Sequence, residues 1–121
     1  MPVRLTITGG VAVIRCTGSC DLESAPDMED ALASAVRRGV RLVLIDLSHA
    51  RYLDSHGVRV LLRARGEMEA LAGKLVVVGL QWQPRRALDV VGLRNVIPCV
   101  TSREEGMSYL KDPSYAPLSE V

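Results

Sequence analysis

The fold is decided by residues 42–58, which read LVLIDLSHARYLDSHGV. The run from Leu42 to Leu47 is almost continuously apolar, which is typical of a parallel strand covered by helices on both faces. A short loop follows and is predicted to cross the edge of the sheet. Asp54 and Ser55 then form a typical helix start, since such side chains cap free backbone N–H groups. The stretch therefore predicts a buried strand, a loop and a helix in succession.

The flanking sequence repeats this alternation of strands and helices. Gly9 and Gly10 join the first two strands, which predicts an antiparallel hairpin, and a loop is expected over Gly18–Leu22. The predicted strands, all short and rich in apolar or β-branched residues, are Leu5–Thr8, Val11–Thr17, Leu42–Leu47, Leu75–Val78 and an edge strand at Val96–Ile97. The predicted helices, each with apolar residues at helical spacing, run from a Ser24 cap to Gly39, from Ser55 to Ala72 with Leu62 facing inward, from Pro84 to Gly92, and from Ser102 to Lys111.

Strands that alternate with helices after an opening hairpin predict an α/β fold. We expect a mixed, mostly parallel sheet of four to five strands with about four helices. The chain has 121 residues, which is the length of one domain. Residues 1–111 are expected to form that domain. Residues 112–121 contain two prolines and little apolar periodicity, so we expect a flexible C-terminal tail.

Composition excludes several classes of partner. Fifteen Lys and Arg oppose fourteen Asp and Glu, and the two signs are mixed along the chain, so binding to nucleic acid is not supported. One Trp, three Tyr and no Phe leave few platforms for base stacking. No apolar run approaches the roughly 20 residues of a membrane-spanning helix, and the N-terminus lacks a signal-peptide core. We expect a cytoplasmic protein that does not bind membranes, and its charged helix faces suggest a monomer.

Metal and cofactor chemistry also lack support in the sequence. The odd count of cysteines, at Cys16, Cys20 and Cys99, does not suit a disulfide framework. A Cys-x3-Cys pair with no nearby pair of histidines is a weak zinc motif, so we expect buried thiols that pack as small apolar residues. Neither a Gly-x-Gly-x-x-Gly nor a Walker-type loop occurs. No metal and no cofactor are therefore expected.

Asp54 and Ser55 open a helix beyond the carboxyl end of a buried strand, where functional crevices lie in open α/β sheets. One interpretation is that either residue simply caps the helix. Another is that Ser55 is a regulatory phosphorylation site, because free backbone N–H groups and the helix dipole would hold a phosphate there. Such a phosphate adds about −1.5 to −2 charge beside Asp54. That charge would repel an acidic partner or block a close-packed apolar one.

The consecutive order of Asp54, Ser55 and His56 also raises the hypothesis of a small hydrolase. Adjacent residues at a helix start project about 100° apart, so they rarely form the relay that a catalytic triad needs. The Gly-x-Ser-x-Gly elbow is also absent. We therefore expect no catalytic residues and no enzyme activity.

Four short segments, by their order and spacing together, resemble the anti-sigma factor antagonists, the bacterial branch of the STAS domain family. Ile45-Asp46-Leu47-Ser48 is similar to the Asp-Leu-Ser-like turn that ends the family's buried strand, and Asp54-Ser55-His56-Gly57-Val58 to its Asp-Ser-Ser-Gly-Leu string. Gly18-Ser19-Cys20-Asp21 stands where the family has a Gly-Glu-Leu-Asp-like loop, and Gly92-Leu93 matches its Gly-Leu pair. The resemblance spans about residues 3–111. His56 replaces the second serine of the usual string.

The resemblance implies a protein-interaction switch rather than an enzyme. An unmodified antagonist of this family binds an anti-sigma factor that is itself a serine kinase, and thereby frees a sigma factor for transcription. The kinase phosphorylates the serine after the Asp, which by position is Ser55, and a PP2C-type phosphatase can restore the unmodified form. The implied partner-binding residues are Asp21, Ser48, Asp54, His56, Gly57 and Arg59, with Arg63 a weaker candidate. The alternative is a STAS adaptor or scaffold without a switch, in a stress-signalling or lipid-transport complex.

Overall fold

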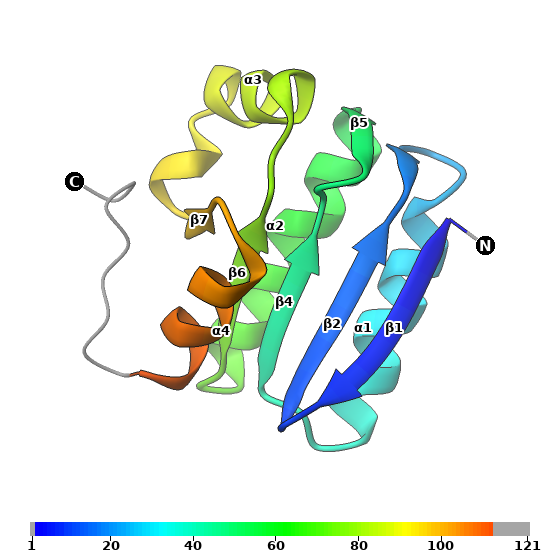
Figure 1. Cartoon of the computed structure of the whole chain (residues 1–121). Helices are drawn as coiled ribbons and strands as arrows, with labels where there is room; N and C mark the ends of the chain where they lie inside the picture. The colour runs from blue at the N-terminus through cyan, green and yellow to red at the C-terminus, as the bar shows by residue number, and fades with distance from the viewer. Residues whose placement is uncertain (1, 113–121) are drawn as a thin grey trace.

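A five-stranded sheet runs through the centre of the computed structural model, which describes residues 2–112 (Figure 1). The order of the strands across the sheet is β1-β2-β4-β6-β7. Strand β1 pairs antiparallel with β2, and every other neighbouring pair is parallel. The strands are β1 (Val3–Thr8), β2 (Val11–Cys16), β4 (Leu42–Asp46), β6 (Lys74–Val78) and β7 (Cys99–Val100). The predicted mixed, mostly parallel sheet with an opening hairpin is confirmed.

The hairpin turn explains why two glycines follow each other. Thr8 pairs with Val11, so Gly9 and Gly10 form a two-residue connection, with φ angles of +56° and +78°. Positive φ at both central residues is what a type I′ turn requires, and glycine adopts it without steric cost. The hairpin adds β1 to one edge of an otherwise parallel sheet.

Four α-helices surround the sheet in the described part of the chain. Helices α1 (Ala25–Arg37) and α2 (Ser55–Ala70) cover one face, and α4 (Arg103–Lys111) covers the other (Figure 1). Helix α3 (Trp82–Val90) and a short 3-10 helix, η1 (Leu93–Asn95), lie beyond the carboxyl ends of the parallel strands (Figure 1). The prediction of about four helices is confirmed, each within a few residues of its expected limits.

The apolar strands are buried on both faces because each face has its own core. Alternate residues of β2, β4 and β6 pack toward α1 and α2 or toward α4, as the two-residue period of a strand dictates. The larger core, on the side of α1 and α2, includes Ile14, Met28, Ile45, Leu61 and Val77. The smaller core, on the side of α4, includes Val13, Leu44, Val76, Val78 and Leu110. The three cysteines are buried, as predicted.

Two strands that the sequence did not predict form a second, small parallel sheet. They are β3 (Gly18–Cys20) and β5 (Ala50–Leu53), and both were expected to be loop. Ser19 pairs with Tyr52 and Cys20 with Leu53. Segments of three and four residues show too little periodicity to be recognised, so tertiary pairing decides their structure. This sheet brings residues 20–21 to the start of α2.

The predicted edge strand at Val96–Ile97 is wrong. The backbone N–H of Ile97 donates to the carbonyl of Leu93 at 2.8 Å, which continues the turn of η1. The edge strand begins two residues later at Cys99 and pairs with β6. Pro98 separates the two, and a proline cannot donate a hydrogen bond to a neighbouring strand.

Two local predictions on the helices also need correction. Leu62 was expected to face inward but is 42% exposed, because the inner face of α2 is formed by Val60, Leu61, Ala64 and Met68. Ser24 precedes α1 as predicted, but its side chain caps no helical N–H group. Its hydroxyl instead donates to the carbonyl of Ser19 at 2.8 Å and so fastens β3 to the start of α1.

No helix within residues 2–112 combines the length and the apolar composition needed to cross a bilayer. Asp112 follows α4 and is exposed. The remainder of the predicted flexible tail, residues 113–121, lies outside the described residues.

Candidate functional site

Asp54 is the residue that caps α2. Its backbone is extended, and its carboxylate Oδ1 accepts hydrogen bonds from the N–H groups of His56 at 2.8 Å and Gly57 at 3.1 Å. This geometry satisfies two of the donors that a helix start leaves without partners. The capping interpretation therefore holds for Asp54. Ser55, the next residue, begins the helix without serving as its cap.

The hydroxyl of Ser55 is exposed at the first position of α2. Within the described part of the chain it makes no hydrogen bond, neither to Asp54 nor to His56. A triad would need a base in contact with that oxygen, and the geometry provides none. The hydroxyl is thus accessible to another protein.

The electrostatics of the corner formed by the start of α2 are dominated by the ionised carboxylate of Asp54. Partial burial alone would raise the pKa of Asp54, but hydrogen bonds from Gly57 and His56 outweigh it and lower the pKa below its usual value. The Nδ1 atom of His56 lies 3.5 Å from Oδ2 of Asp54, so the ring forms an ion pair when it is protonated. Two of the N–H groups that were expected to hold a phosphate on Ser55 are therefore already bound to Asp54.

Gly57 lies beneath this surface because α2 approaches β3 closely. A Cβ atom at position 57 would overlap the carbonyl oxygen of Cys20 and lie 2.5 Å from Cδ1 of Leu53. The N–H of Asp54 also donates to the carbonyl of Cys20 at 3.2 Å. Gly57 is buried, so it supports the predicted partner surface from below.

Asp21 reaches the same corner through the small sheet. Strands β3 and β5 are parallel and adjacent, so the residues after their carboxyl ends, Asp21 and Asp54, emerge on the same side. The carboxylate of Asp21 accepts from the N–H groups of Glu23 and Ser24, which fixes the loop before α1. The structure therefore brings Asp21 together with the Asp54–Ser55 pair, although these residues are more than thirty positions apart in the chain.

Ser48 stands apart from this group and serves a different carboxylate. Its hydroxyl donates to Oδ1 of Asp46 at 2.6 Å, and its backbone N–H donates to the same oxygen at 2.9 Å. Asp46 is only 3% exposed and also contacts Arg15 and Arg103. Burial would raise the pKa of Asp46, but these donors and positive charges together lower it. Ser48 is exposed at the end of β4, so its place on a partner surface stays a prediction.

The two arginines of α2 differ in their surroundings. Arg59 is exposed one turn after Ser55. Arg63 forms an exposed ion pair with Glu29 of α1 at 3.3 Å. Exposed pairs of this kind contribute little to stability, about 0–1 kcal/mol. Arg63 is therefore occupied within the molecule, whereas Arg59 remains on the surface beside the candidate site.

Sequence reasoning missed the contact between Gln83 of α3 and Leu53 of β5, here called the brace, that holds this site against α3. The side-chain amide of Gln83 accepts from the N–H of Leu53 at 2.7 Å and donates to the carbonyl of Leu53 at 3.1 Å. It thus imitates a neighbouring strand at the free edge of β5. Tyr52 and Trp82, which are 48% and 75% exposed, flank this contact. No motif marks these residues, because the contact joins segments thirty positions apart.

Among residues 2–112, no three side chains of His, Cys, Asp or Glu lie close enough together to hold a metal ion.

The sequence matches the family model described as the STAS domain over residues 2–106. It is 32% identical over 96 residues to the anti-sigma-F factor antagonist RsfB of Mycobacterium tuberculosis, which covers 76% of this chain and 78% of RsfB.

The fold is also similar to solved structures. An anti-sigma factor antagonist from Mycobacterium paratuberculosis superposes with a TM-score of 0.82 at 24% identity, covering 91% of this chain and 93% of that one. The Bacillus cell fate determinant SpoIIAA, solved in its phosphorylated form, gives a TM-score of 0.72 at 22% identity over 90% and 99% of the two chains.

Proposed function

Because this chain belongs to the STAS domain family, we propose that it is an anti-sigma factor antagonist controlled by phosphorylation of Ser55. In this proposal the unmodified protein binds an anti-sigma factor that is also a serine kinase. Phosphorylation of Ser55 releases the complex, and a PP2C-type phosphatase reverses it. The observation that carries the proposal is the exposed hydroxyl of Ser55, which lies next to the Asp54 cap and makes no hydrogen bond within residues 2–112.

The charge at this corner gives the switch its physical basis. The carboxylate of Asp54 has a lowered pKa and is therefore ionised near neutral pH. It already accepts the N–H groups of His56 and Gly57, so a phosphate on Ser55 gains few donors from the helix start. The added charge of about −1.5 to −2 remains on the surface beside a second negative charge. An interface that packs tightly against this corner would lose affinity through repulsion and desolvation.

The proposed contact surface centres on Asp54, His56 and Arg59, and Asp21 joins it through the small sheet. Gly57 contributes by allowing α2 to approach β3. Ser48 extends the surface toward the end of β4. We expect substitutions at Arg59 to weaken partner binding more than substitutions at Arg63, which pairs with Glu29.

The test is a binding titration with a purified anti-sigma factor kinase from the same genome. Ser55→Asp should bind at least about tenfold more weakly than the wild type, which corresponds to about 1.4 kcal/mol. Ser108→Asp is the matched control, because Ser108 is exposed on α4 and that helix covers the opposite face of the sheet. The control should bind like the wild type.

A second measurement separates the switch from a permanent adaptor. Incubation with the kinase and ATP should add one phosphate to the wild type, measured by intact mass, and none to Ser55→Ala. If the kinase binds but Ser55 is never modified, the protein is an adaptor without a switch. Unchanged affinity of Ser55→Asp would contradict the proposed mechanism of release.

A further inference from the structure

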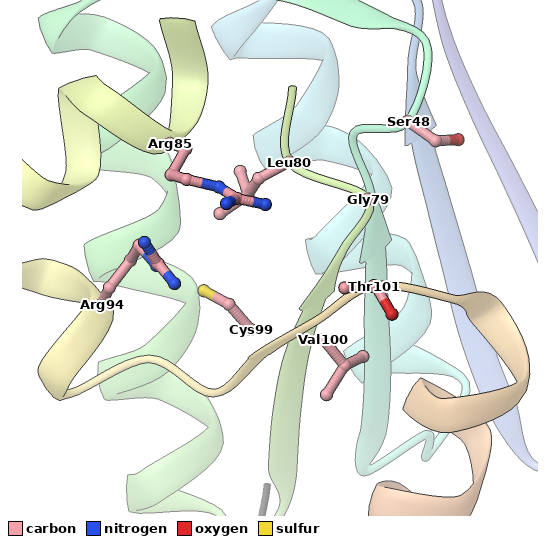
Figure 2. Close-up of a pocket in the computed structure, with 8 residues that line it drawn as sticks. All are labelled: Ser48, Gly79, Leu80, Arg85, Arg94, Cys99, Val100 and Thr101. Carbon is pink, nitrogen blue, oxygen red and sulfur yellow. The ribbon is translucent and has the colours of Figure 1, made fainter. Parts of the chain in front are cut away.

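A cavity of about 460 Å³ lies beyond the carboxyl ends of β6 and β7 (Figure 2). The loops after β4 and β6 form one side, and α3, η1 and β7 form the others. Ligands of open α/β sheets bind at this end of the strands. The volume is also within the usual range for small-molecule pockets, about 300–1,000 Å³.

Two guanidinium groups are directed into this cavity. Figure 2 shows Arg85 from α3 and Arg94 from η1 reaching into the same space above Cys99. Within the described residues, the guanidinium of Arg85 makes no hydrogen bond and no ion pair. Arg94 is bound to Asp89 through Nη1, at 3.1 and 3.2 Å. The Nε atom of Arg94 is buried and has no hydrogen-bond partner in the part of the chain that the structure describes.

The inner edge of Arg94 carries donors of the kind that bind an oxyanion. Since Asp89 uses Nη1, the fork formed by Nε and Nη2 has no acceptor among residues 2–112. Such a fork donates two parallel hydrogen bonds to a carboxylate or phosphate. A buried donor without an acceptor costs free energy, which an incoming oxyanion would recover. Arg94 is therefore oriented by Asp89 and still lacks an acceptor for its inner edge.

The balance of charge around the cavity favours an anion. Arg85 and Arg94 carry two positive charges, and Asp89 offsets one of them. Burial raises the pKa of the Cys99 thiol to about 11, so the thiol is neutral near neutral pH and offsets nothing. One net positive charge remains for a ligand to neutralise.

The other lining residues are mixed: Leu80 and Val100 are apolar, and Ser48 and Thr101 carry hydroxyl groups. We propose that the cavity binds a small organic anion, whose carboxylate or phosphate head is held by Arg85 and Arg94 and whose short apolar body lies against Leu80 and Val100. Ser55 does not line the cavity, whereas Ser48, which belongs to the proposed partner surface, does; anion binding is measured without the partner, so its failure would leave the proposed switch untouched.

The test is an NMR titration of the ¹⁵N-labelled full chain with two probes, phenyl phosphate and phenylacetate, at constant ionic strength. At least one should give saturable shifts in the amides of Gly79, Leu80 and Val100 and in the Nε–H signal of Arg94. The tighter probe identifies the preferred head group. Benzyl alcohol, which has a similar body and no charge, should give no saturable shift.

Substitutions identify the residues that hold the head group. Arg85→Gln and Arg94→Gln should each weaken binding at least about tenfold, since each removes a charge-assisted contact. Arg86→Gln is the matched control, because Arg86 lies over the Trp82 ring at 6.0 Å and does not line the cavity. Arg85→Gln removes no internal bond and should melt like the wild type, so it decides the result even if Arg94→Gln fails to fold. The proposal is overturned if neither anion saturates, if benzyl alcohol binds equally well, or if Arg85→Gln binds like Arg86→Gln.

Discussion

Replacing Gln83 with alanine should weaken the molecule at the junction between α3 and the candidate site. The amide of Gln83 makes two hydrogen bonds with the backbone of Leu53, at 2.7 and 3.1 Å. Leu53 is the last residue of β5 and directly precedes the Asp54 cap. Its side chain is buried, with 1% exposure. Gln83→Ala removes both bonds without disturbing the helix, because alanine is a strong helix former.

The magnitude follows from the two bonds. A typical internal hydrogen bond contributes about 0.5–1.5 kcal/mol net, so their loss should lower the free energy of unfolding by about 1–3 kcal/mol. Domains of this size have total stabilities of about 5–15 kcal/mol. The melting temperature should fall by about 3–15 °C for a chain of this length. The effect should be largest if water cannot reach the carbonyl and N–H of Leu53.

Chemical denaturation measures the loss, and hydrogen exchange locates it. The amide of Leu53 should exchange at least about tenfold faster in Gln83→Ala, which corresponds to about 1.4 kcal/mol of lost protection. Gln81→Ala is the control, because Gln81 makes one exposed bond to the carbonyl of Ser48. If Gln83→Ala is no less stable than Gln81→Ala, the brace does not hold β5 and the reasoning fails.

Two further predictions concern packing and charge near the site. Gly57→Ala should destabilise the fold by about 1–3 kcal/mol in urea titrations, because its Cβ would overlap Cys20. Gly66→Ala on the same helix should stabilise the fold by about 0.5–1 kcal/mol, since no described neighbour lies within 4 Å of the added Cβ. Equal effects of the two substitutions would contradict this account. Asp46→Asn should cost about 1–3 kcal/mol near neutral pH, measured by denaturation across pH. The pKa of Asp46 is lower in the folded protein than the value of about 3.9 in the unfolded chain. The stability that the ionised carboxylate contributes is therefore present above that value and disappears as the pH falls through the folded pKa. The free energies of unfolding of the wild type and of Asp46→Asn should thus converge in acid.

The sequence predicted the elements whose pattern is long enough to read. The apolar runs at residues 42–47 and 75–78 are buried from both faces, which leaves few alternatives to a parallel sheet. The glycine pair at residues 9–10 likewise specifies the hairpin turn. Elements that depend on distant partners were missed: β3 and β5 are too short to show a period, and the edge strand was placed at Val96–Ile97, which continues the turn of η1.

The candidate site was predictable to a similar extent and for the same reason. The Asp54–Ser55 pair follows from a local rule for helix starts, so its position and exposure could be inferred. The brace from Gln83 and the cavity at Arg85 and Arg94 arise only when α3 folds over the end of the sheet. Neither has a local pattern, because an isolated glutamine or arginine on a helix is usually solvated.

The division of roles between Asp54 and Ser55 bears on the kind of switch that the site can form. Had the serine been the cap, its modification would have removed the hydrogen bonds that start α2, and the signal would have carried a cost in stability. Here Asp54 holds the N–H groups of His56 and Gly57, so modification of the Ser55 hydroxyl breaks no hydrogen bond among the described residues. The charge of the surface can therefore change while its shape is kept, which is the property that a reversible binding surface needs.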